Sequence, residues 1–121
     1  MENGMKTVLI ALLYMALPAF GADFSGVWKV TGSIAGNDVT PTCTFTQNSA
    51  KLTGTCKWDQ DSAGVTGEVK DRQATWSYQV EYEGTEYTLT YTGTLGSDTS
   101  MKGSMVADPS DTEGEFTATR Q

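Results

Sequence analysis

Apolar and polar side chains alternate almost without a break from Phe24 to Arg120. An alternation of period two predicts β-strands, because successive side chains of a strand point to opposite faces of its sheet. No stretch after Ala22 shows the spacing of an amphipathic helix. The chain is also rich in threonine, a residue that favours strands. We therefore expect strands over residues 24–31, 39–47, 51–58, 64–70, 73–82, 85–95, 100–107 and 115–120.

Two expected hairpins can be checked against this alternation. A two-residue turn at Glu83-Gly84 would pair Tyr82 with Thr85. Apolar residues of the two strands would then meet on one face, as Val80 with Tyr87, Tyr78 with Leu89 and Trp76 with Tyr91. A second turn, from Asn48 to Lys51, would place Cys43 opposite Cys56. Cross-strand neighbours lie close enough for a disulfide, so we expect these two cysteines to be bonded.

Glycine recurs on the inward face of these strands, with an apolar residue two positions away on either side. An inward glycine lets a strand bend sharply or lets an aromatic ring lie over it. The connections are all short, so consecutive strands should be antiparallel neighbours. The sequence therefore predicts an all-β fold, an eight-stranded antiparallel up-and-down barrel that closes on itself. The five segments that carry this glycine pattern are Phe24–Trp28, Leu52–Cys56, Val65–Val69, Tyr91–Leu95 and Met101–Met105.

Residues 1–21 have the layout of a secretory signal peptide. Lys6 precedes an uncharged apolar run from Val8 to Leu17, a proline follows the run, and small residues precede a cut after Gly21. The run is too short to span a bilayer core of about 30 Å. We expect the exported chain to be residues 22–121, a single domain that is secreted or periplasmic. An oxidising compartment of this kind favours a disulfide between its two cysteines.

Gly26-Val27-Trp28 on the first expected strand resembles the G-x-W motif of calycins, the group of lipocalin, fatty-acid-binding and avidin-like barrels. In that group the tryptophan packs at the closed end of the barrel, beneath a basic residue from the last strand. The resemblance implies that Trp28 and Arg120 make this contact here. It also implies a barrel over residues 24–120.

The layout is also similar to that of periplasmic inhibitors of secreted metalloproteases. Those proteins are eight-stranded barrels with the same motif and one disulfide between the second and third strands, where Cys43 and Cys56 stand here. They reach the protease with a segment that precedes the first strand, whereas only Ala22 to Ser25 would precede Gly26 in this exported chain. The resemblance implies inhibition of a secreted hydrolase as a second possible function.

The composition excludes several classes of function. The chain has 15 acidic and 8 basic residues, a formal net charge of −7 and a pI of about 4.3, which argues against a general nucleic-acid binder. The absence of histidine removes histidine-based catalytic triads, and two cysteines are too few for a four-thiolate metal site. We expect a non-enzymatic protein with no cofactor and no metal.

Connections alternate between the two ends of an up-and-down barrel, so acidic residues should gather at one end. The opposite end should carry Lys51, Lys70, Arg72 and Arg120. A rim of a single sign attracts cations or a basic partner. The expected rim carboxylates are Asp38, Asp59, Asp61, Glu81, Glu83, Glu86, Asp108, Asp111 and Glu113.

Two hypotheses for the function follow from this end of the barrel. In the first, inward aromatic rings line an opening for a small apolar or aromatic ligand, although the same rings could instead fill a solid core. These candidate ligand-binding residues are Trp58, Tyr78, Tyr82 and Tyr87. In the second, the barrel is a scaffold whose acidic loops bind a basic secreted hydrolase, such as lysozyme or a protease. These candidate partner-binding residues are Asp59, Asp61, Asp108 and Asp111.

Overall fold

The fold is built from antiparallel strands alone. The computed structural model describes residues 23–121, so the expected signal peptide and its cleavage after Gly21 lie outside the described residues. In the described part no helix is long and apolar enough to cross a membrane. The strands are β2 (Gly26–Ile34), β3 (Asn37–Val39), β4 (Thr42–Asn48), β5 (Lys51–Trp58), β6 (Asp61–Lys70), β7 (Gln73–Tyr82), β8 (Thr85–Ser97), β9 (Ser100–Asp108) and β10 (Thr112–Arg120).

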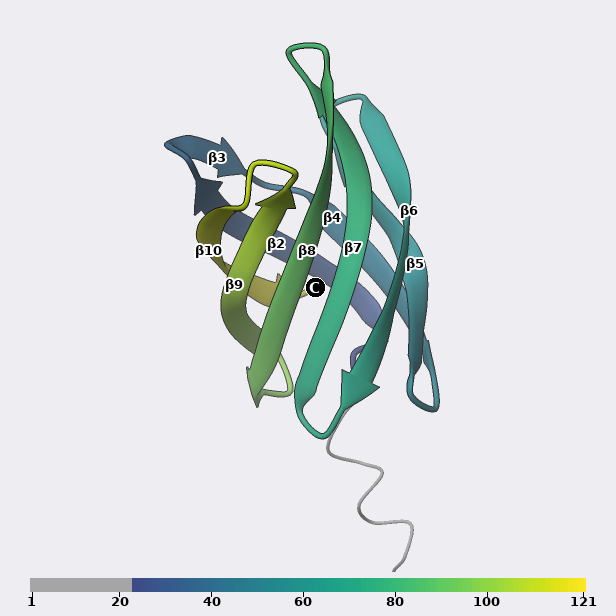
Figure 1. The fold of residues 1–121 in the computed structure, drawn as a ribbon. Coiled ribbons are helices and arrows are strands. Elements are labelled where there is room, and N and C mark those ends of the chain that lie inside the picture. Colours follow the sequence, from purple (N-terminus) through teal and green to yellow (C-terminus); the bar gives the residue numbers. More distant parts are fainter. Residues whose placement is uncertain (1–22) are drawn as a thin grey trace, which may run out of the picture.

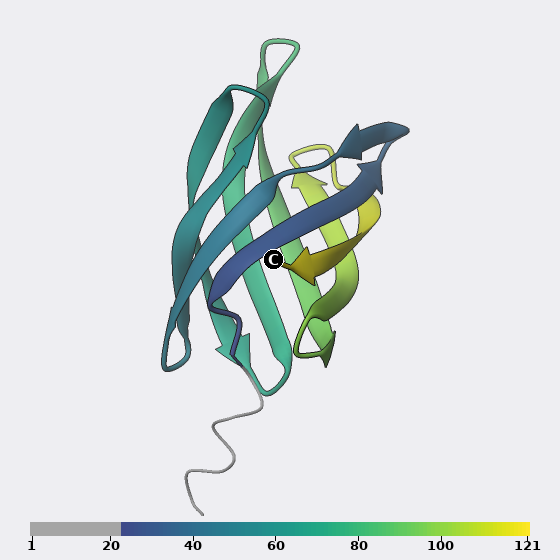
Figure 2. The same ribbon diagram turned by 180° about the vertical axis from the view of Figure 1, so that it is seen from behind.

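The sheet closes into a barrel, as predicted (Figures 1 and 2). Consecutive strands pair with each other, and β10 returns to pair antiparallel with β2, from Gly114 opposite Ile34 to Arg120 opposite Trp28. Closure joins the first strand to the last, so β2 and β10 are not left as the two outer edges of an open sheet.

Nine strands fill eight positions because β3 and β4 share one of them. Both pair with β2, and their registers continue one another, with Gly32 opposite Val39 and Lys29 opposite Thr42. Pro41 interrupts the ladder because it has no N–H to donate. Its carbonyl still accepts a hydrogen bond of 3.0 Å from the Val30 N–H. The expected single strand over residues 39–47 is therefore wrong in detail, since it starts earlier and is broken.

Other strand boundaries also differ from the expected ones at the acidic end. The first strand continues to Ile34, β6 begins at Asp61, and β10 begins at Thr112. The connections are tighter than expected because several non-glycine residues adopt positive φ angles in these turns, among them Asp59 at 51° and Asp111 at 56°. Pairing can then continue almost to the tip of each hairpin.

Both hairpin registers are confirmed. Tyr82 pairs with Thr85, and the apolar pairs further along β7 and β8 are those expected. The backbone φ angles of Glu83 and Gly84 are both positive, 52° and 83°, which fits the two-residue turn. Cys43 and Cys56 are bonded, with their Cα atoms 4.0 Å apart. The disulfide indicates an oxidising, exported environment.

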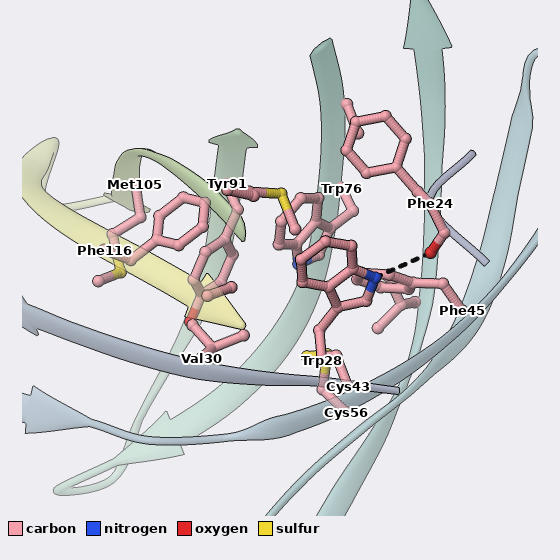
Figure 3. Packing of buried hydrophobic residues seen from close by; sticks show 14 of the residues in the cluster. Phe24, Trp28, Val30, Cys43, Phe45, Cys56, Trp76, Tyr91, Met105 and Phe116 are labelled. Carbon is pink, nitrogen blue, oxygen red and sulfur yellow. Dashed lines mark hydrogen bonds between the residues drawn. A yellow bond between two sulfur atoms is a disulfide. The ribbon is translucent and has the colours of Figure 1, made fainter. Parts of the chain in front are cut away.

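A cluster of aromatic rings fills the middle of the barrel (Figure 3). The Trp76 ring stacks on the Tyr91 ring, with centroids 5.2 Å apart and planes 4° from parallel. Phe45 and Phe116 meet Trp76 edge to face. The rings lie close to the backbone of neighbouring strands where glycines stand, as at Gly67, which pairs with Trp76. The middle of the barrel is therefore a packed aromatic core.

The basic end is closed by the contact that the resemblance implied. The Arg120 guanidinium lies 4.5 Å from the centre of the Trp28 ring. It also donates hydrogen bonds to the carbonyls of Ser25, Asp23 and Asp98, the last two at 2.6 and 2.7 Å. Arg120 thereby ties the segment before β2 to the last strand and to the β8–β9 turn. A binding site is therefore expected at the opposite, acidic end.

Candidate functional site

The acidic end is formed by four hairpin connections. All nine expected rim carboxylates are exposed, and the connections that carry most of them contain no lysine or arginine. Asp59 and Asp61 belong to the β5–β6 hairpin, whereas Asp108 and Asp111 belong to the β9–β10 hairpin. These two hairpins lie on opposite sides of the ring of strands, so the four predicted partner-binding residues form two separate pairs.

The hairpin of β7 and β8 projects beyond the other strands at this end (Figures 1 and 2). Pairing between β8 and β9 begins only at Thr88 and Asp108, so the residues from Thr85 to Tyr87 extend past their neighbour strand. Inward side chains on this projecting part lack a neighbouring strand on the β9 side. An opening therefore forms under the hairpin.

A pocket of about 410 Å³ occupies this opening. It lies between the β2–β3 turn, the β7–β8 hairpin and the β9–β10 connection. Its walls are mostly apolar, and a few polar groups stand at its edge. The lining residues are Ile34, Ala35, Asn37, Asp38, Val39, Val80, Tyr82, Tyr87, Leu89, Ala107, Ser110 and Thr112.

The four predicted ligand-binding residues fall into two pairs. Tyr82 and Tyr87 line the pocket together. Trp58 and Tyr78 do not line it and instead stack on each other, with ring centroids 5.4 Å apart. Tyr78 is buried and its hydroxyl lies 2.7 Å from that of Tyr91. The structure thus brings half of the predicted set to the pocket and places the other half against the core.

Sequence reasoning missed the walls contributed by the other hairpins, above all Ile34, Val39 and Ala107. The alternation already placed Val39 and Ala107 on inward faces next to the acidic connections. Ranking every inward residue by its distance from a strand end, and not only the aromatic ones, would have found these two. Ile34 was expected in a connection, so its inward direction became visible only when β2 proved longer.

Burial raises the pKa of Tyr78 and of Tyr91 above the ordinary tyrosine value, because the phenolate form would lose its hydration. The pKa of Tyr78 is raised further by repulsion from the ionised form of Tyr91 and by the hydrogen bond between the two hydroxyls. Both hydroxyls are therefore neutral at physiological pH, and their hydrogen bond holds the two rings in place.

Removing one hydroxyl of this pair should cost more than removing both. Tyr78→Phe leaves the Tyr91 hydroxyl buried without its partner, and we expect the free energy of unfolding to fall by about 1 to 2 kcal/mol. The double variant Tyr78→Phe/Tyr91→Phe should cost no more than either single one, because neither ring then carries a polar group. Urea unfolding of the unmodified protein, the two single variants and the double variant gives this double-mutant cycle. If the losses in unfolding free energy of the two single variants simply added up in the double variant, the pairing of the hydroxyls would be contradicted.

The same pair predicts loss of stability at alkaline pH. The unfolded chain releases these protons at the ordinary tyrosine pKa of 10.0, whereas the folded chain retains them. The contribution to stability is complete below that pH and is lost as the pH rises above it. Urea unfolding at about pH 8 and about pH 11 should show a smaller loss for the double phenylalanine variant than for the unmodified protein.

None of the protein-family models and none of the curated proteins matches the chain. Among solved structures, the chain is similar to a redesigned β-barrel, with a TM-score of 0.60 and 19% sequence identity. The match covers 80% of this chain and 90% of that one. The similarity shows the barrel fold alone.

Proposed function

We propose that this protein is an exported, non-enzymatic binding protein that holds a small apolar or aromatic ligand in the pocket at the acidic end. One observation carries the proposal. Among the described residues the one large hydrophobic side chain that stands exposed is Tyr82, at 50%, and it lies on the wall of this pocket. A ligand in the pocket would cover the exposed face of this ring.

The size and the lining of the pocket support this proposal. Ligand sites are typically concave, mostly apolar and roughly 300 to 1,000 Å³ in volume, with a few polar groups that orient the ligand. The pocket has about 410 Å³, and its apolar wall is accompanied by Asn37, Asp38, Ser110 and Thr112. Trp58 and Tyr78 support the barrel behind the proposed site and do not touch the ligand.

The proposal includes export of the protein and a calycin-like type of barrel. The apolar leader and the disulfide support export to the periplasm or the exterior, with cleavage after Gly21. The G-x-W motif and the contact of Arg120 with Trp28 support a calycin-like barrel. In a calycin-like barrel the end opposite this contact is the open one, and the pocket lies there.

Binding of a neutral aromatic probe tests the proposed function. N-phenyl-1-naphthylamine carries no charge, so the acidic rim neither attracts nor repels it, and its fluorescence rises in an apolar site. We expect Tyr82→Ala to weaken its binding about tenfold, the equivalent of one well-buried ring contact. Ala107→Leu should weaken binding at least as much, because its larger side chain fills the pocket.

The matched control is Ala63→Leu, which adds the same bulk on β6 near the same end but outside this pocket. Circular dichroism should show that all three variants keep the barrel. Equal binding of the probe by the unmodified protein, Tyr82→Ala and Ala107→Leu would overturn the proposed site.

A second candidate function is inhibition of a basic secreted hydrolase through the acidic rim. The observation that favours it is the exposure of all nine rim carboxylates at one end. A basic target such as lysozyme would then associate quickly at low salt, because opposite charges steer the encounter. Neutralising Asp59, Asp61, Asp108 and Asp111 to the corresponding amides should slow association about tenfold. Association indifferent to salt and to this change would exclude the mechanism.

A further inference from the structure

The barrel wall is incomplete between β6 and β7. These two strands pair only from Thr66 opposite Ser77 to Lys70 opposite Gln73, near the basic end. Toward the acidic end, residues 61–65 of β6 pair only with β5, and residues 78–82 of β7 pair only with β8. Two strand edges therefore face each other without pairing, and the course of both strands can be followed in Figure 1. We call the space between them the β6–β7 slot.

The register shows which backbone groups face the slot. In a hairpin with a two-residue turn, the residues that flank the turn bond to each other, and every second residue after them does the same. Tyr82 flanks the β7–β8 turn, so Gln79 and Glu81 direct their N–H and C=O groups away from β8 and toward the slot. On the other edge Ser62 and Gly64 do so by the same rule. All four residues are exposed.

The slot is a surface groove whose lining includes one aromatic side chain. A recess of about 360 Å³ lies over it. Gly64 is exposed on the outer face of β6, where an added Cβ atom would meet nothing within 4 Å. Tyr78 lines the recess, and its ring is stacked on Trp58 of β5. The recess is lined by Ala63, Gly64, Thr66, Ser77, Tyr78, Gln79 and Thr88.

The negative charges beside the slot favour a basic segment as its occupant. Glu81 lies directly opposite Glu86 on the outer face of the β7–β8 hairpin, and like charges in this position destabilise a strand pair. On the other side of the slot, Asp61 is the first residue of β6. The nearby cation Lys57 belongs to β5, where it pairs with Ser62, so β6 lies between Lys57 and the slot. A second copy of this chain would bring its own Glu81 and Glu86 to the edge and be repelled. A basic segment would relieve the repulsion between the two glutamates.

We propose that the β6–β7 slot binds an extended, basic segment of a partner protein as an added strand. The segment pairs with the edge of β7 through the N–H and C=O groups of Gln79 and Glu81, which is the mode of recognition by strand addition. Its small apolar side chains face Tyr78 and Ala63, and its lysine or arginine side chains lie beside Glu81 and Glu86 on the outer face. This site is separate from the pocket under the hairpin and does not depend on a ligand there.

A short peptide of alternating lysine and valine, seven residues long and blocked at both ends, is the probe. Hydrogen exchange followed by NMR should find the Gln79 and Glu81 amides open in the free protein and slowed about tenfold or more with the peptide at saturation. A peptide of the same sequence with N-methyl groups on the bonding edge keeps its charge but cannot pair. It should bind about tenfold more weakly, since it loses at least two hydrogen bonds.

Two variants distinguish the contribution of backbone hydrogen bonds to peptide binding from the contribution of charge. Gln79→Pro removes one N–H that faces the slot and none that bonds to β8, so the barrel should keep its circular dichroism while the peptide binds several-fold more weakly. Glu81→Gln/Glu86→Gln should weaken binding and reduce its dependence on salt. The proposal is overturned if the methylated peptide binds equally well, if the affected amides lie elsewhere, if Gln79 and Glu81 are already protected in the free protein, or if no binding is seen at low salt.

Discussion

Gly67→Ala should lower the free energy of unfolding by about 3 to 4 kcal/mol, whereas Gly64→Ala on the same strand should change it by less than about 1 kcal/mol. A Cβ atom at position 67 would lie 2.2 Å from the Thr75 carbonyl oxygen and 2.9 Å from the Cα of Trp76. Both atoms belong to the backbone of β7, which cannot yield without separating the strands. At position 64 the added atom meets nothing within 4 Å.

Urea unfolding followed by circular dichroism compares these two variants under the same conditions. The pair is matched because both substitutions add one methyl group to β6, and neither position has a positive φ angle. Equal effects at the two positions would show that the close approach of β6 and β7 at Gly67 does not limit the fold.

Loss of the disulfide should cost about 3 kcal/mol. The bond joins residues 13 positions apart, and closing a loop of this length in the unfolded chain removes conformational entropy of about that size. A chain of this length is stabilised by only roughly 5 to 15 kcal/mol in total, so Cys43→Ala/Cys56→Ala should lower the melting temperature markedly. The core should remain folded, because the buried aromatic cluster does not depend on the bond.

Dithiothreitol supplies the control for this prediction. Urea unfolding of the unmodified protein should move to lower concentrations when the bond is reduced, and the alanine variant should be indifferent to the reductant. A loss below about 1 kcal/mol, or equal sensitivity of both proteins to dithiothreitol, would contradict the stabilising role of the bond.

The pairing of neighbouring strands could be predicted from the sequence because it depends on local patterns. Alternation sets which face a residue occupies, and a two-residue turn sets which residues meet. These two rules are enough to place Tyr82 opposite Thr85 and Cys43 opposite Cys56, as the structure confirms. The predicted closure followed from the number of strands and their short connections.

The site could be predicted only in part because it depends on how far each strand extends relative to its neighbours. Alternation correctly placed Tyr82 on the inward side, but it could not show that the β7–β8 hairpin projects and leaves this ring half exposed. It likewise could not show that β6 and β7 part after Thr66 and Ser77. Divergence of this kind follows from the coiling of the whole barrel, which no single strand encodes.

Mapping of the bound probe by NMR tests the central claim most directly, namely that a small apolar ligand occupies the pocket under the β7–β8 hairpin. With N-phenyl-1-naphthylamine added to the unmodified protein, the amide shifts should concentrate at Val39, Val80, Tyr87 and Ala107, and the amide of Trp58 should change little. Saturable shifts confined to another surface, or no shifts up to the solubility limit of the probe, would contradict the claim.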